Sequence, residues 1–175
     1  MAEPASGAAA GASGLRLLFV CMGNICRSPT AHGVMRHKVR EAGWAGRVLV
    51  DSAGTHGWHA GEPPDERSVA HARQRGYDIA DLRSRQLREG DFAQFDLLLV
   101  MDERNLADAR DLGPTRHHGK LRLLTGFGVR HRAPSVPDPY YGSARGFEHV
   151  LDLIEDACDG LIEHVRRELG RPQGG

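Results

Sequence analysis

The sequence predicts an α/β protein in which helices cover both faces of a parallel sheet. Two apolar runs support this fold class: residues 15–20 (LRLLFV) and 95–101 (FDLLLVM) are apolar almost throughout, as strands buried on both faces are. A segment with helical spacing of apolar residues follows each run. Because strands that alternate with helices form parallel sheets, the 175 residues fit a single domain of this class.

The first expected strand, residues 15–20, leads into a loop containing Gly23 and Asn24, the two residue types that best tolerate a positive φ. The Ser-Pro pair at 28–29 is typical of an N-cap followed by a first helical turn. We therefore expect a helix from this pair to about Ala42, directly after the loop.

The remaining elements follow the same alternation. Further strands are expected at residues 48–50, 95–101 and 121–124, and further helices at residues 65–75, 102–112 and 147–169. The last helix carries apolar residues at steps of three and four, and a proline-rich loop, residues 133–142, precedes it. Ligands bind at the carboxyl ends of strands in such sheets, where Cys21 and Asp102 fall.

Composition argues against several classes of function. The 23 basic and 23 acidic residues cancel, so no net charge attracts nucleic acid or an anionic membrane. No apolar run approaches the roughly 20 residues of a membrane span. Three cysteines cannot all pair, which favours a reducing, cytoplasmic location and leaves secretion without a signal peptide open. Residues 1–14 are expected to be a disordered leader, followed by one domain over residues 15–170.

The segment VCMGNICRSPT contains Cys21, five residues, Arg27 and then Ser28. This spacing alone is weak, because it arises by chance in roughly a third of chains with such a composition. The preceding strand and the following helix make it more specific, since backbone amides at a helix N-terminus bind anions. Arg27 can then hold two phosphoryl oxygens, and a thiolate at Cys21 can attack the phosphorus without a metal. The alternative is a buried structural cysteine with Arg27 on the surface.

The loop closely resembles the phosphate loop of the low-molecular-weight protein tyrosine phosphatases. The resemblance continues through DSAGT (51–55), WHAGEPPDER (58–67), SRQL (84–87), DF (91–92), FDLLLVMDERN (95–105) and VPDPYYG (136–142). It implies a three-layer sandwich with a central four-stranded parallel sheet, and cofactor-free hydrolysis of phosphotyrosine and aryl phosphates through a cysteinyl-phosphate intermediate. Cys21 would be the nucleophile and Arg27 the phosphate clamp. The residues expected to bind phosphate or support the loop are Met22, Gly23, Asn24, Ile25, Cys26 and Ser28.

Transfer of a phosphoryl group from a phenol requires a proton for the leaving oxygen. The residues alone allow Asp138, Asp102 or Asp51 to donate it, and the Asp-Pro pair of VPDPYYG could equally be a turn. The family resemblance selects Asp138, which lies between two prolines that stiffen its loop.

Aromatic side chains are expected to enclose the substrate ring. Trp58 matches one aromatic wall of the family, and Tyr140 and Tyr141 directly follow the expected acid. The alternative for two adjacent tyrosines is half-buried packing. In some relatives these tyrosines are phosphorylated, which makes them candidate regulatory sites.

Two further positions follow from the resemblance. Cys26 is expected to form a reversible disulfide with Cys21 that prevents over-oxidation, with a small buried filler as the alternative. Asn24 resembles the family residue that holds the loop through side-chain hydrogen bonds, but Leu82 replaces the histidine that supports it in many relatives. Cys158, in the apolar stripe of the last helix, is expected in the core.

Two other functions, arsenate reduction and phosphotyrosine binding without turnover, require different residues. An arsenate reductase needs resolving cysteines, and none lies between Arg27 and Cys158. A phosphotyrosine-binding module needs neither the thiol nor the acid. No metal site is expected, and His117, His118 and His131 are assigned to the solvated surface. Expected partners are phosphotyrosine proteins and a cognate tyrosine kinase, with inorganic phosphate and other oxyanions as competitors; we expect a monomer.

Overall fold

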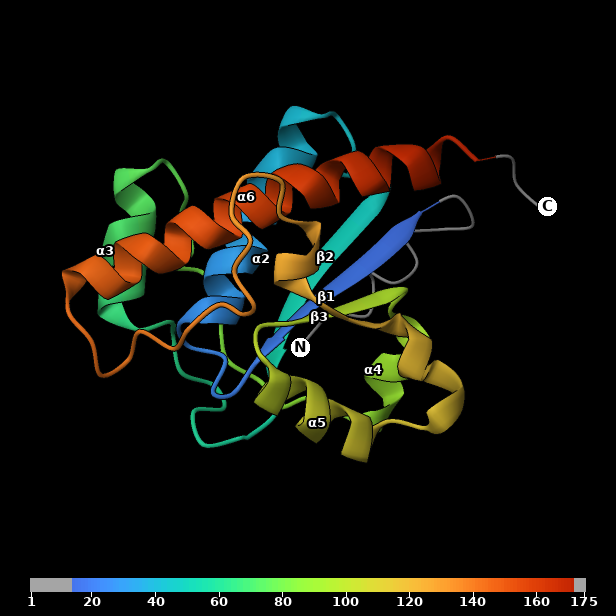
Figure 1. Ribbon diagram of the computed structural model, residues 1–175, viewed down its shortest axis with the longest axis horizontal. Coiled ribbons are helices and arrows are strands. Elements are labelled where there is room, and N and C mark those ends of the chain that lie inside the picture. The colour runs from blue at the N-terminus through green and yellow to red at the C-terminus, as the bar shows by residue number, and fades with distance from the viewer. Residues whose placement is uncertain (1–13, 172–175) are drawn as a thin grey trace.

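The computed structural model describes residues 14–171, which form a four-stranded sheet between two layers of helices (Figure 1). The strands are β1 (Leu15–Cys21), β2 (Val48–Gly54), β3 (Leu97–Val100) and β4 (Leu121–Leu123). Their order is β2-β1-β3-β4, and every neighbouring pair is parallel. The predicted three-layer α/β sandwich is therefore confirmed. The predicted leader, residues 1–14, lies outside the described residues apart from Gly14.

The helices form two groups. On one face of the sheet lie α2 (Arg27–Glu41), α3 (Glu66–Gln74) and α6 (Ala144–Leu169), and on the other face lie α4 (Glu89–Gln94) and α5 (Glu103–Leu112) (Figure 1). Two short 3₁₀ helices, η1 (Thr115–Lys120) and η2 (Leu124–Phe127), flank β4. Of these elements, α4, η1 and η2 were not predicted. In the part of the chain from 14 to 171, no helix is both long and apolar enough to cross a membrane.

The strand boundaries differ from the prediction at two places. β2 was expected to end at residue 50, but it continues to Gly54, which pairs with Cys21 at the end of β1. Glycine is required at the end of this extension, because a Cβ on Gly54 would lie 2.7 Å from the Met22 carbonyl oxygen. β3 is shorter than expected, since Phe95 ends α4 and Met101 accepts a hydrogen bond from Val136 in the proline-rich loop.

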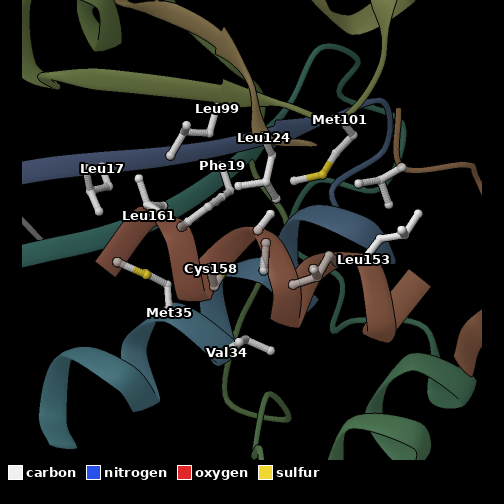
Figure 2. Packing of buried hydrophobic residues seen from close by; sticks show 14 of the residues in the cluster. Leu17, Phe19, Val34, Met35, Leu99, Met101, Leu124, Leu153, Cys158 and Leu161 are labelled. Atoms are coloured by element: carbon white, nitrogen blue, oxygen red, sulfur yellow. The ribbon is translucent and has the colours of Figure 1, made fainter. Parts of the chain in front are cut away.

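Alternate side chains of β1 enter two separate cores. Leu17 and Phe19 pack against α2 and α6, as Figure 2 shows. Leu18 and Val20 point to the other face, where Phe92 of α4 is buried. Burial on both faces explains why the strand is apolar without alternation. This arrangement fixes the end of β1, and with it Cys21, between the two helical layers.

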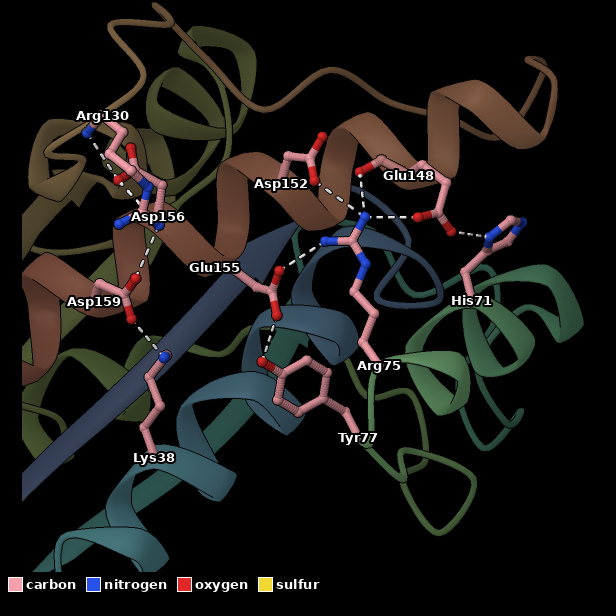
Figure 3. A network of polar contacts seen from close by, with 10 residues as sticks. All are labelled: Lys38, His71, Arg75, Tyr77, Arg130, Glu148, Asp152, Glu155, Asp156 and Asp159. Atoms are coloured by element: carbon pink, nitrogen blue, oxygen red, sulfur yellow. Dashed lines mark hydrogen bonds and ion pairs between the residues drawn. The ribbon is translucent and has the colours of Figure 1, made fainter.

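Polar side chains on one edge of α6 bind to α2 and to the end of α3 (Figure 3). Arg75 forms ion pairs with Glu148 and Glu155, and Lys38 of α2 pairs with Asp159. Such half-exposed pairs contribute at most about 1 kcal/mol each, so the apolar stripe of α6 is the main source of its attachment.

One buried carboxylate of α6 anchors the segment that leads into the proline-rich loop. Asp156 accepts backbone hydrogen bonds from Val129, Arg130 and His131, at 2.8–3.1 Å. Burial alone would raise the pKa of this carboxyl, but the three N–H donors outweigh it and the pKa is lowered. Asp156 therefore remains charged and holds residues 129–131, which lead to the candidate acid Asp138.

A histidine is also buried between α2 and β2. The His32 side chain on α2 lies 3.1 Å from the Ser52 hydroxyl of β2, measured from Nδ1 to Oγ. Burial is the main reason that its pKa falls to about 4; the nearby Arg36 also lowers it, while Asp51 opposes. His32 is therefore neutral in the folded protein at pH 7.

This histidine predicts loss of stability in mild acid. Above pH 6.5 His32 is neutral in both states, but between about 6.5 and 4 the unfolded chain binds a proton that the folded chain does not. This proton should lower the free energy of unfolding by roughly 3 kcal/mol as the pH falls to 4. His32→Asn should flatten this decrease in urea-unfolding experiments, whereas the exposed His149→Asn should not. An unchanged pH dependence in His32→Asn would contradict the assignment.

Candidate active site

The carboxyl end of β1 and the N-terminus of α2 are joined by a tight loop, residues 22–26. Cys21 is the last residue of β1, and Arg27 is the first residue of α2. The loop therefore combines the backbone N–H groups and positive dipole of a helix N-terminus with a reactive side chain. It also lies at the carboxyl ends of the two central strands, β1 and β3, where ligands bind in such sheets.

The cysteine sulfur is hydrogen-bonded to Ser28. Cys21 Sγ lies 3.0 Å from the Ser28 hydroxyl oxygen and accepts from the Ser28 backbone N–H at 3.4 Å. Our prediction that Ser28 is the N-cap of this helix is wrong: the N-cap is Cys26, and α2 begins at Arg27, two residues earlier than expected. Because Ser28 lies in the first turn, its hydroxyl points toward the sulfur instead of toward the helix end.

Asn24 determines the shape of the loop. It is the only non-glycine among residues 14–171 with a positive φ, of 60°. Its Nδ2 donates to Ser28 Oγ at 2.7 Å, and its Oδ1 accepts from the Arg85 backbone N–H at 3.0 Å. The backbone N–H of Arg85 thus holds the Asn24 side chain, and Leu82 packs in the core.

Gly23 leaves space for a neighbouring side chain. Its φ is not positive, although glycine tolerates such a value. A Cβ at this position would lie 3.1 Å from the His59 ring, so glycine allows the ring to cover the loop. The Gly23 carbonyl also accepts a hydrogen bond from the Ser84 hydroxyl. Residues 84–85 therefore hold the loop through hydrogen bonds, and the His59 ring packs against it.

Arg27 is almost fully buried and is oriented by two groups. Its Nη1 donates to Asp102 Oδ2 at 2.7 Å and to the Val136 carbonyl at 3.0 Å. Burial alone would lower its pKa, but the nearby Cys21, Asp102 and Asp138 outweigh this effect and the pKa is raised. The guanidinium is therefore permanently charged, and one of its nitrogens is fixed by the protein.

The three candidate acids lie in different surroundings. Asp102 caps α5 by accepting from the Asn105 N–H and binds Arg27, and Asp51 pairs with Arg85. Asp138 lines the pocket with a half-exposed side chain, its Oδ2 3.9 Å from Arg27 Nη2. The other two carboxylates are therefore committed to structural partners.

A pocket of about 210 Å³ opens above Cys21. The predicted residues that line it are Cys21, Met22, Gly23, Ile25, Cys26, Arg27, Trp58, Asp138, Tyr140 and Tyr141. Asn24 and Ser28 do not line it and lie behind the loop. Trp58 is 66% exposed and stacks on His56, with ring centroids 4.2 Å apart. The aromatic side chains therefore form the rim of the pocket and the phosphate loop forms its floor.

Sequence reasoning missed His59, which also lines the pocket. Its Nδ1 lies 2.9 Å from Glu62 Oε1. Its position next to Trp58 and its three-residue spacing from Glu62 were the available signals, but only the fold places its ring over Gly23.

The remaining thiols are buried and unpaired. Burial raises the pKa of Cys26 to about 12, and a hydrogen bond from Ser68 opposes this only in part. Burial likewise raises the pKa of Cys158 to about 12, and this residue packs in the core as predicted. Within residues 14–171, no group of three or more His, Cys, Asp and Glu side chains is placed to hold a metal ion.

A parallel α/β sandwich that places a cysteine, an arginine and a carboxylate around a loop at a helix N-terminus is typical of phosphatase-type hydrolases. The family model described as low molecular weight phosphotyrosine protein phosphatase matches residues 16–171. The chain belongs to this family, and it is a hydrolase of the protein-tyrosine-phosphatase class.

Individual relatives agree over nearly the whole chain. A putative low molecular weight protein-tyrosine-phosphatase of Synechocystis sp. is 42% identical over 156 residues, which are 89% of this chain and 99% of that protein. A low molecular weight protein-tyrosine-phosphatase of Streptomyces coelicolor is 43% identical over 88% of this chain and 95% of its own length. The crystal structure of a protein tyrosine phosphatase from Entamoeba histolytica, with Hepes in its active site, has a TM-score of 0.85 and 38% identity, covering 87% and 97% of the two chains.

Proposed function

We propose that this protein hydrolyses protein phosphotyrosine, and aryl phosphates in general, through a cysteinyl-phosphate intermediate. The observation that carries the proposal is the floor of the pocket, where Cys21 Sγ lies 3.0 Å from Ser28 Oγ at the N-terminus of α2. The hydroxyl and the backbone N–H of Ser28 both contact this sulfur, which lies at the positive end of the α2 dipole. A thiolate beneath a bound phosphate is a nucleophile placed for in-line attack.

The proposed reaction has two steps. In the first, the Cys21 sulfur bonds to phosphorus, the bond from phosphorus to the phenolic oxygen breaks, and Asp138 gives its proton to that oxygen. In the second, water attacks the phosphorus, Asp138 takes the proton of the water, and the sulfur–phosphorus bond breaks to release inorganic phosphate. Arg27 and the loop amides stabilise the charge on the equatorial oxygens in both steps, so the mechanism requires neither a metal nor a cofactor.

The rim of the pocket supports an aromatic substrate. Trp58, Tyr140 and Tyr141 surround the opening, and a phenyl ring can stack between such side chains. We therefore assign phosphotyrosine proteins as substrates, with a cognate tyrosine kinase acting in the opposite direction. Inorganic phosphate and other oxyanions are expected to compete; Hepes, which lies in the active site of the Entamoeba relative, carries a sulfonate. The proposal includes a monomer in a reducing, cytoplasmic environment that keeps Cys21 reduced.

The test of this function is turnover of phenyl phosphate and of a phosphotyrosine peptide in buffer containing a metal chelator. We expect both to be hydrolysed. An arsenate-dependent thiol oxidation assay, run in parallel, tests the arsenate reductase alternative, for which the core residue Cys158 would have to leave its buried position. Arsenate-dependent oxidation without phosphate release would overturn the proposal.

The role of Asp138 predicts a dependence on the leaving group. A basic leaving oxygen needs the acid most, so Asp138→Asn should slow release of phenol from phenyl phosphate on the order of 10²–10³-fold, and release from an activated nitrophenyl ester much less. Pre-steady-state release of the phenol measures this step directly.

The control for the acid is Asp102→Asn. This change weakens the support of Arg27 and the cap of α5, so it should slow both esters by a similar factor. Leaving-group dependence in Asp102→Asn but not in Asp138→Asn would show that the acid has been misassigned.

We also propose that Cys26 protects the nucleophile by forming a reversible disulfide with Cys21. Peroxide would convert the Cys21 thiolate to a sulfenic acid, and the Cys26 thiol would displace water from it to close the disulfide. Burial raises the pKa of Cys26 to about 12, so it is a thiol at pH 7 and does not compete with Cys21 for the phosphate. As the disulfide closes, its proton leaves with the hydroxyl of the sulfenic acid as water.

After mild peroxide treatment, the native protein should regain most of its activity with added thiol, whereas Cys26→Ser should regain far less, because sulfenic acid is then oxidised further. Activity assays before and after dithiothreitol measure this recovery. Equal recovery in both proteins would leave Cys26 as a buried filler.

A further inference from the structure

Arg67 lies beside the pocket and has no role in the proposed reaction, yet it is fixed to the phosphate loop. The Asp65 backbone N–H donates to the carbonyl of Ile25, in that loop, at 2.8 Å. The Asp65 carboxylate in turn accepts from Arg67 Nε at 3.0 Å and from Nη2 at 2.8 Å. This two-point pairing sets the plane of the guanidinium relative to the loop.

The same guanidinium contacts the opposite side of the pocket. Arg67 Cζ lies 5.3 Å from the ring centroid of Tyr140 and 4.8 Å from that of Phe147 on α6. Both distances are within the range of cation–π attraction. The Tyr140 backbone N–H donates to Asp138 Oδ1 at 3.1 Å, so the ring is joined to the residue that carries the acid. Arg67 therefore bridges the phosphate loop and the loop that forms an aromatic wall.

Tyr140 is 38% exposed, so few side chains hold its ring in place. Its aromatic neighbour Tyr141, with ring centroids 4.9 Å apart, is 94% exposed and gives little support. Val136, which is bound to Met101 and Arg27, anchors the same loop but lies four residues earlier. Arg67 is thus the contact that joins the ring itself to a rigid helix.

We propose that Arg67 is a positioning residue that holds Tyr140 over the pocket and so sets the affinity for the ring of an aryl phosphate. This inference rests on the proposed function only for the identity of the ligand. An exposed cation–π contact corresponds to about two- to fivefold in binding. The phosphate group itself is held by the loop and Arg27, so its affinity should not depend on Arg67.

Calorimetric binding of two probes, phenylphosphonate and inorganic phosphate, separates these contributions without turnover. Arg67→Ala should weaken phenylphosphonate binding about two- to fivefold and leave phosphate binding unchanged. Arg67→Lys keeps the charge but not the planar stack, so its affinity for phenylphosphonate should lie between those of the native protein and Arg67→Ala. In a Tyr140→Ala background, Arg67→Ala should cause no further loss. The exposed Arg73→Ala on the same helix is the matched control, and unfolding temperatures confirm that each variant folds.

The inference is overturned if Arg67→Ala leaves the ratio of the two affinities at the native value. It is also overturned if phosphate binding weakens in parallel, or if the loss persists in full without the Tyr140 ring. Failure of the proposed function would look different, because the native protein would then bind these anions but not hydrolyse phenyl phosphate.

Discussion

Replacement of Cys21 by Ser is expected to abolish turnover of aryl phosphates, by a factor on the order of 10⁴ or more, and to leave the fold and phosphate binding intact. Within the described residues, the polar atoms that contact the sulfur are the hydroxyl and the backbone N–H of Ser28. Neither is a base, so an alcohol at position 21 would keep its proton and would not attack phosphorus. The amides of the loop and Arg27 would still bind the anion.

Steady-state kinetics with phenyl phosphate and calorimetry with inorganic phosphate measure the two properties separately. Cys158→Ala is the control, because this cysteine is buried in the core and its loss should affect stability without removing activity. Appreciable turnover by Cys21→Ser would exclude the covalent mechanism. Loss of phosphate binding together with activity would point instead to a disrupted loop.

The second large effect is expected from Arg27→Lys, which should lower kcat/KM on the order of 10²–10³-fold. Arg27 binds Asp102 and the Val136 carbonyl through Nη1, which leaves its other nitrogens for the phosphoryl oxygens. A lysine has one charged nitrogen and cannot serve both sets of partners. Because Val136 lies two residues before Asp138, the substitution should also loosen the loop that carries the acid.

Arg36→Lys is a matched control for this change. Like Arg27, Arg36 binds an aspartate and a backbone carbonyl. Its Nη1 and Nη2 donate to the carboxylate of Asp81, and Nη2 also donates to the backbone carbonyl of Asp78. Arg36 does not line the pocket. Its replacement should leave kcat/KM within about twofold, as surface changes do. If Arg27→Lys retains more than about a tenth of the native activity, bidentate clamping of phosphate is not its role.

The sequence contained enough to predict the main elements of the fold, because those elements are defined by local patterns. The apolar run at residues 15–20 matches β1, and the three- and four-residue steps over residues 147–169 match α6, which begins three residues earlier, at Ala144. The prediction missed α4, which has six residues and too few apolar positions for a helical pattern. It also ended β2 too early, because Asp51 and the small residues after it resemble a turn until their pairing with β1 is known.

The candidate site was predicted less evenly. Cys21, Arg27 and Asp138 could be named because the spacing of the loop and the resemblance of VPDPYYG to a known family identify them, and their roles remain proposals. The N-cap assigned to Ser28 was wrong, since a serine before a proline has the same local pattern whether it caps the helix or lies in its first turn. His59 was missed because its place in the pocket depends on contact with Gly23, which lies 36 residues earlier in the chain.

The sequence by itself therefore determined the fold class, the family and the chemical groups of the pocket, since each depends on residue type and on spacing along the chain. Only the tertiary structure shows how the candidate carboxylates are placed. Asp102 and Asp138 both lie near Arg27, but Asp102 also caps α5, whereas Asp138 faces the pocket. The contact between Arg67 and Tyr140 is likewise visible only in the tertiary structure, because it joins segments far apart in sequence. Such contacts form only when the chain packs, so no local pattern encodes them.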